Sequence, residues 1–168
     1  YHVAPVALAE VLADVVPMVE PVLAERGLTF ALHLPDHPGA RPPRVLADRA
    51  RLAQVLLNLL SNAGKFTPAG GHVAIEVARP DAARRDAVGD VVFVRVHDTG
   101  VGIPADQHET VFAPFVQLDG GARRAHGGTG LGLAISRDMA RGMGGELRVR
   151  STVGAGTTFT LTLREAKN

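Results

Sequence analysis

The sequence predicts an α+β fold, a two-layer sandwich in which a mixed, mostly antiparallel sheet packs against about three helices. Helical and strand patterns are interspersed along 168 residues, a length that suits one domain with a sizeable core. The last two apolar segments, 146–150 and 157–163, flank Gly154-Ala155-Gly156 and form a hairpin, which excludes a purely parallel sheet. No internal repeat is present, so a repeat array is excluded as well.

The composition is that of a globular domain, with 46% hydrophobic and 21% charged residues. A net charge of +1 and a pI of about 8.5 do not favour a nucleic-acid partner. No apolar stretch approaches the roughly 18 residues of a membrane span, and no cysteine is present to form a disulfide or a thiolate metal site. We therefore predict a cytoplasmic domain. Since the chain begins at Tyr1 rather than Met, we expect a fragment of a longer protein, whose membrane attachment stays open.

The first element is a helix over residues 6–26. Pro17 and Pro21 interrupt it, so we expect a kink or two short helices. Two interpretations stay open: a helix packed on its own domain, or a linker descending from an upstream module. We divide the chain into a helical linker region at 1–26 and a main domain at 27–168. The helix is predicted from an apolar stripe of Leu8, Val11, Leu12, Val15, Val16, Val19, Val22 and Leu23.

The middle of the chain alternates between strands and a helix. Residues 28–34 alternate as a half-buried strand does, and a Pro-rich loop follows to about Val45. Asp48 stands where an N-cap or a first-turn acid of an amphipathic helix would, and 72–78 and 91–97 are predicted as strands. The apolar face of that helix consists of Leu52, Val55, Leu56, Leu59 and Leu60.

The last third begins with an irregular segment. Within 104–128, Val111 and Phe112 suit a helical turn, but several glycines favour a loop. A helix is predicted over 131–143, and Gly144-Gly145 end it before the terminal hairpin.

Four short segments carry the chemistry. In Asn58–Lys65 (NLLSNAGK), Asn58, Asn62 and Lys65 are spaced i, i+4, i+7 and share one helix face. Carboxamide oxygens suit a hard cation such as Mg²⁺, and an ammonium suits phosphate. A solvated helix face is the plain alternative for this motif taken alone.

The second segment, Asp98–Ile103 (DTGVGI), follows a hydrophobic strand. A carboxylate at a strand end accepts a hydrogen bond from an exocyclic amine and so distinguishes adenine from guanine. Gly100 and Gly102 allow the backbone to approach the base closely. An ordinary Asp-Thr-Gly turn is the alternative.

The third segment, Gly127–Leu133 (GGTGLGL), opens a helix, and the fourth, Gly154–Phe159 (GAGTTF), closes the terminal hairpin. Backbone amides at a helix N-terminus bind polyphosphate. A Rossmann fingerprint would need a strand directly before the glycines, whereas the charged sequence ARRAH precedes them. A Walker-type glycine-lysine-serine sequence is absent too, so another fold must hold the nucleotide.

In this order the segments resemble the ATP-binding catalytic domain of sensor histidine kinases, of the GHKL superfamily. From about Asp48 to Phe159 the chain looks like that domain, whose Bergerat-type fold is shared with gyrase-type topoisomerases, mismatch-repair ATPases and certain chaperones. The segments match the N, G1, G2 and G3 boxes, and a fifth, Phe112-Ala113-Pro114-Phe115, resembles the F box. The stretch at about 104–128 corresponds to a flexible ATP lid.

The resemblance implies roles for individual residues. It implies that Asn62 binds Mg²⁺, that Lys65 faces the phosphates, and that Asp98 contacts the adenine amine through a site that Thr157 supports. Asn58, Lys65 and Arg124 are the implied catalytic residues. The implied nucleotide-binding residues are Asn58, Asn62, Lys65, Phe66, Asp98, Gly100, Gly102, Ile103, Phe115, Arg123, Gly128, Thr129, Gly130, Leu131, Gly132, Leu133 and Thr157. For Arg123 and Arg124 a solvated loop is the alternative.

One position bears on the reaction. Hydrolysing relatives carry a glutamate general base at the first N-box position, where this chain has Asn58. That difference favours a protein-histidine kinase, which transfers the γ-phosphoryl group of Mg-ATP, over an ATP hydrolase.

The phosphoacceptor is the missing part. Among seven histidines, only His108-Glu109-Thr110 faintly resembles the phosphoacceptor motif, and it lacks the arginine and the long helix. We therefore expect a monomeric fragment whose partners are its own dimerisation and phosphoacceptor domain and a response regulator receiver domain. A serine kinase of the anti-sigma-factor type and a non-catalytic nucleotide-sensing module are the alternatives.

Overall fold

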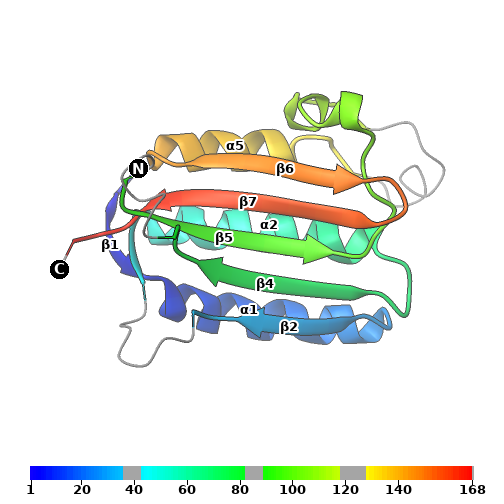
Figure 1. The fold of residues 1–168 in the computed structure, drawn as a ribbon, viewed down its shortest axis with the longest axis horizontal. Coiled ribbons are helices and arrows are strands. Elements are labelled where there is room, and N and C mark those ends of the chain that lie inside the picture. Colours follow the sequence, from blue (N-terminus) through cyan, green and yellow to red (C-terminus); the bar gives the residue numbers. More distant parts are fainter. Residues whose placement is uncertain (36–42, 82–88, 118–127, 168) are drawn as a thin grey trace.

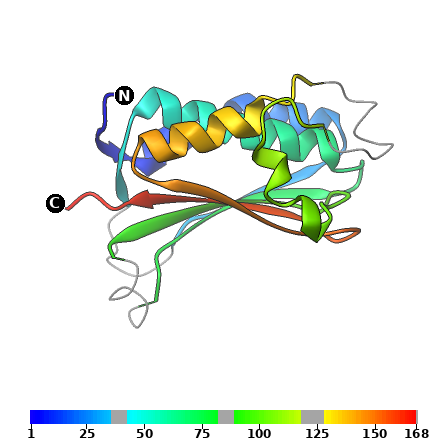
Figure 2. The same cartoon turned by 90° about the horizontal axis from the view of Figure 1, so that it is seen from above.

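The computed structural model describes residues 1–35, 43–81, 89–117 and 128–167. Three α-helices lie against one face of a five-stranded sheet, and no helix among these residues covers the other face (Figures 1 and 2). The helices are α1 (Leu8–Glu25), α2 (Arg49–Phe66) and α5 (Gly132–Gly142). This arrangement confirms the predicted α+β sandwich.

The sheet has the strand order β2-β4-β5-β7-β6. β2 runs parallel to β4, and the remaining neighbours are antiparallel, which confirms a mixed, mostly antiparallel sheet. The last residue of β5, Asp98, lies opposite Thr157 near the start of β7, so the second and fourth motifs meet at one edge. The strands are β2 (Thr29–His33), β4 (His72–Ala78), β5 (Val91–Asp98), β6 (Glu146–Thr152) and β7 (Gly156–Arg164).

The core lies between the sheet and α2. Every second residue of β5 is buried toward the helices, as a strand with one covered face requires. The predicted apolar face of α2 is buried completely against it. Asp48 caps α2 by accepting hydrogen bonds from the N–H groups of Ala50 and Arg51, at 3.1 and 3.2 Å. A bond from the N–H of His2, together with these, holds the pKa of Asp48 below its usual value.

The N-terminal segment packs on the rest of the molecule. α1 lies beside α2 and buries six apolar residues, and it continues through Pro17 and Pro21, so the expected division into two short helices does not occur. Both prolines are exposed, where the carbonyl groups that lose an N–H partner can bind water. The boundary at residue 26 stays a prediction.

Two local features differ from what the sequence predicts. Two short strands, β1 (Ala4–Ala7) and β3 (Arg44–Ala47), pair antiparallel apart from the main sheet, and neither was expected. In the described part of the lid segment, the 3-10 helix η1 (Ala105–Gln107) was not expected, whereas the 3-10 helix η2 (Thr110–Phe112) forms where Val111 and Phe112 suited a helical turn. Among the described residues, no helix combines the length and the apolar character that a membrane span needs.

Candidate functional site

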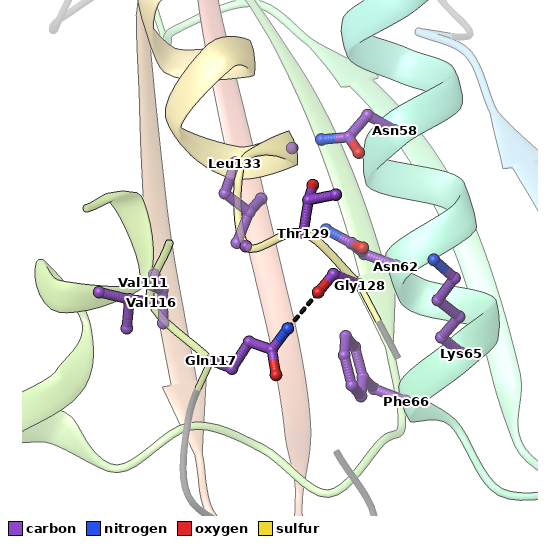
Figure 3. Close-up of a pocket in the computed structure, with 12 residues that line it drawn as sticks. Asn58, Asn62, Lys65, Phe66, Val111, Val116, Gln117, Gly128, Thr129 and Leu133 are labelled. Atoms are coloured by element: carbon purple, nitrogen blue, oxygen red, sulfur yellow. Dashed lines mark hydrogen bonds between the residues drawn. The ribbon is translucent and has the colours of Figure 1, made fainter. Parts of the chain in front are cut away.

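Two adjoining cavities lie between α2, α5 and one edge of the sheet. The larger, of about 190 Å³, extends along α2 toward the start of α5, and the smaller, of about 40 Å³, reaches the ends of β5 and β7. They share Asn62, Phe66, Val111 and Leu133, so they adjoin along these side chains. Figure 3 shows the larger cavity, with Asn58, Asn62 and Lys65 on α2 and with Gly128 and Thr129 on the facing loop.

The smaller cavity ends at a fixed carboxylate. The Oδ1 atom of Asp98 accepts a hydrogen bond of 2.8 Å from the N–H of Gly100, which orients the side chain. Thr157 lies next to it across the β5–β7 ladder and is 94% buried, being 6% exposed. Ile103, Val111 and Leu133 provide apolar walls. A flat, apolar ring with a hydrogen-bond donor at its edge fits this end of the site.

The larger cavity is polar along α2. The Nδ2 atom of Asn58 donates to the Oγ of Ser136 on α5 at 2.7 Å, which ties the two helices together. A Cβ atom at Gly132 would lie 2.5 Å from the Asn58 Oδ1 atom, so a larger residue there would require the Asn58 side chain to move. Asn62 and Lys65 line the same cavity one and two turns further along. The Lys65 ammonium, the Asn58 and Asn62 carboxamides and the N-terminus of α5 together suit an anionic group with a bound metal cation.

The two described ends of the lid are joined. The N–H of Phe115 donates to the carbonyl of Gly130 at 3.0 Å, and the Gln117 side chain donates to the carbonyl of Gly128 (Figure 3). Phe115 has a φ of 60°, which is uncommon for a residue other than glycine, and its side chain is 75% exposed. The first described part of the lid segment is thus attached to the loop that opens α5.

Arg137 holds Glu109 and η2 of the lid segment against α5. Its guanidinium lies 4.4 Å from the centre of the Phe112 ring and pairs with Glu109 at 2.8 Å and with Glu146 at 3.0 Å. The hydrogen bond to Glu109 raises the pKa of Arg137 and lowers that of Glu109. Burial opposes ionisation of Glu146, but bonds from Arg141 and Arg137 outweigh it and lower its pKa.

We expect Arg137→Gln to destabilise the fold by about 1–2 kcal/mol, because a largely buried cation loses its ring contact and its ion pair with Glu146. The pKa values of Glu109 and Glu146 are lowered in the folded state, so their contribution is present above the unfolded pKa and is lost on acidification. The stability difference between the variant and the wild type should therefore shrink from about pH 7 to pH 4. Urea unfolding across that range tests this, with Arg148→Gln, at an exposed position of β6, as the matched control. A stability difference that does not vary with pH would contradict the prediction.

Most of the predicted site residues line the adjoining cavities. Phe115 and Leu131 do not line either one, and Gly100 acts only behind Asp98. Arg123 and Arg124 lie outside the described residues. Five lining residues were not predicted from the sequence. The apolar ones among them carry no sequence signal that distinguishes the wall of a cavity from a core position. The missed residues are Ala63, Val111, Val116, Gln117 and Phe159.

Comparison with known proteins identifies one matching family and similar curated proteins. Residues 47–167 match the family described as "Histidine kinase-, DNA gyrase B-, and HSP90-like ATPase". The chain is 45% identical over 119 residues to the circadian input-output histidine kinase CikA of Synechococcus elongatus, covering 71% of the chain and 15% of CikA. It is 39% identical over 160 residues to the aerobic respiration control sensor protein ArcB of Escherichia coli K12, covering 95% of the chain and 19% of ArcB.

A solved structure resembles the whole chain. Full-length ShkA in complex with AMPPNP superposes with a TM-score of 0.80 at 34% identity, covering 99% of this chain and 32% of ShkA. The chain therefore spans less than a third of ShkA and less than a fifth of each of the two curated relatives.

Proposed function

The chain belongs to the family of histidine kinase-, DNA gyrase B- and HSP90-like ATPases, as an ATP-binding catalytic domain of the sensor histidine kinase type, and we propose that it transfers the γ-phosphoryl group of Mg-ATP to a histidine on a separate module. The observation that carries the proposal is that the two cavities adjoin and differ in chemistry. The oxygen atoms of Asp98 and Thr157 close the apolar end. The Lys65 ammonium and the carboxamides of Asn58 and Asn62 line the polar end. A molecule with a flat base at one end and phosphates at the other matches that division.

We assign the base to the end formed by Asp98 and Thr157. Both side chains offer oxygen atoms that can accept hydrogen bonds. The adenine amino group donates to such acceptors, whereas the carbonyl of guanine at the same position would face a like-charged oxygen. Phe66, Ile103 and Leu133 would cover the faces of the ring.

We assign the phosphates and the metal to the α2 end. Among the described residues no three His, Cys, Asp or Glu side chains gather into a metal site. A magnesium ion would therefore take most of its ligands from phosphate oxygens and water, with the Asn62 carboxamide as a protein ligand. Lys65 and the amides of the loop at Gly128–Gly130 would neutralise and orient the phosphates, which is most of what phosphoryl transfer requires.

Asn58 supports transfer over hydrolysis. Its amide nitrogen donates to Ser136, and a carboxamide has no basic group to activate water. The acceptor would then be a histidine supplied by another domain, and onward transfer to a response regulator receiver domain follows from the two-component role we propose. The direct test mixes the chain with radiolabelled ATP and a separate helical hairpin that carries the phosphoacceptor histidine. Acid-labile phosphate on the hairpin is expected, and acid-stable phosphate would favour a serine kinase instead.

We predict that Asn62→Ala weakens ATP binding about tenfold in Mg²⁺ and less than about threefold in EDTA, because the lost oxygen serves the metal. Calorimetry in the two buffers measures this. Gln54→Ala is the matched control, since it removes a carboxamide from an exposed position of the same helix. An equal loss in both buffers would mean that Asn62 contacts the nucleotide without the metal.

A further inference from the structure

A serine outside the assigned site residues lies directly behind the smaller cavity. The Ser151 hydroxyl, on β6, is within hydrogen-bond distance of three groups. It lies 2.7 Å from the N–H of Ile103, 2.8 Å from the carbonyl of Gly156 and 2.8 Å from the hydroxyl of Thr157. One side chain thus connects the loop after β5 to the first two residues of β7.

Proton counting gives these bonds a direction. The amide of Ile103 can only donate and the carbonyl of Gly156 can only accept. Ser151 has one hydroxyl proton, and satisfying Gly156 uses it. The 2.8 Å contact between Ser151 and Thr157 then needs the proton of Thr157, so Thr157 donates to Ser151. No other assignment satisfies all three contacts.

This direction determines what Thr157 offers to the cavity. Because its proton is used on Ser151, its oxygen can only accept toward the cavity that it lines with Asp98. Asp98 is an acceptor too, and its Oδ1 is oriented by Gly100. The base end of the site therefore presents two neighbouring acceptors and no rotating hydroxyl that could donate to a carbonyl.

We propose that Ser151 is a positioning residue for base selection: it holds Thr157 as an acceptor and so strengthens the preference for a 6-amino purine over a 6-oxo purine. This inference rests on the proposed binding of ATP. If Ser151 is removed, the Thr157 hydroxyl can rotate and donate to a 6-oxo group, directly or through water. Ile103 loses its partner as well, but that loss affects every purine nucleotide alike.

The test compares ATP with ITP, which has a carbonyl in place of the 6-amino group. We expect wild type to prefer ATP, and Ser151→Ala to narrow the ratio of the two dissociation constants by about five- to tenfold. In a Thr157→Val background, Ser151→Ala should leave the ratio unchanged, because no hydroxyl is left to rotate. Ser61→Ala, at an exposed position of α2, is the control and should leave the ratio at the wild-type value.

The outcomes distinguish a failure of the role proposed for Ser151 from a failure of the proposed ATP binding. Equal weakening of ATP and ITP binding by Ser151→Ala, or a ratio that also changes in the Thr157→Val background, would overturn the role of Ser151 alone. Failure of the wild type to bind ATP would overturn the proposed function and this inference with it. Thermal unfolding of each variant checks the fold. If the alanine variant does not fold, Ser151→Cys replaces it with the same expected narrowing of the ratio, because a thiol of similar size is a weak acceptor for the Thr157 proton.

Discussion

Asp98→Asn is expected to lower the affinity for ATP by about 30- to 100-fold, which corresponds to about 2–3 kcal/mol. The reason lies in the bond between Asp98 Oδ1 and the N–H of Gly100. An asparagine has one side-chain oxygen, and the N–H of Gly100 would use it as its acceptor. The loop has little room to shift away from this bond, because it is packed so closely that a Cβ at Gly100 would lie 2.5 Å from the Phe66 carbonyl. The side-chain NH₂ of the variant would then face the adenine amine, so a donor meets a donor.

Calorimetry with ATP and Mg²⁺ measures the loss, and thermal unfolding shows whether the variant is folded. The matched control is Asp106→Asn, which makes the same change at an exposed position in η1 and should leave affinity unchanged. Wild-type affinity in Asp98→Asn would remove this carboxylate from the nucleotide site. A comparable loss in Asp106→Asn would point to net charge rather than to a contact.

Elements with strong local signals were predictable from the sequence. The amphipathic stripe and the N-cap of α2 were both expected, and the structure confirms the cap through bonds to Ala50 and Arg51. The strand at 72–78 was predicted with the bounds of β4. These features depend on neighbouring residues, whose period and capping chemistry are visible in one sequence.

What could not be predicted depends on contacts between distant residues. The strands β1 and β3 have four residues each, too few for a periodic pattern, and each is held by pairing about forty positions away. Ser151 lies just beyond the strand predicted over 146–150 and was given no role, because its role arises where three segments meet. The same holds for Arg137, whose partners lie on η2 and β6. Side chains that connect elements carry no local pattern.

The glycines at the G1 loop and at the terminal hairpin allow strain and crowding to be separated. Gly102 has a φ of +77° and Gly154 a φ of +81°, so an alanine at either position pays about 1 kcal/mol for the left-handed conformation. A Cβ at Gly154 would meet nothing within 4 Å, whereas one at Gly102 would lie 2.2 Å from the carbonyl oxygen of Thr152. The two substitutions therefore share the strain and differ in the clash.

We expect Gly102→Ala to lower the free energy of unfolding by about 3 kcal/mol or more and Gly154→Ala by only about 1 kcal/mol. The clash is with backbone, so the loop after β5 must move away from β6, and that movement breaks the 2.7 Å bond between the N–H of Ile103 and Ser151. Since Ile103 is a wall of the smaller cavity, Gly102→Ala should also weaken ATP binding more than about tenfold, while Gly154→Ala leaves it near the wild-type value. Urea unfolding and calorimetry on both variants test these two predictions. Equal destabilisation of the two variants would show that the loop after β5 relaxes without cost. The close packing of Gly102 against β6 would then not hold the base end of the site in place.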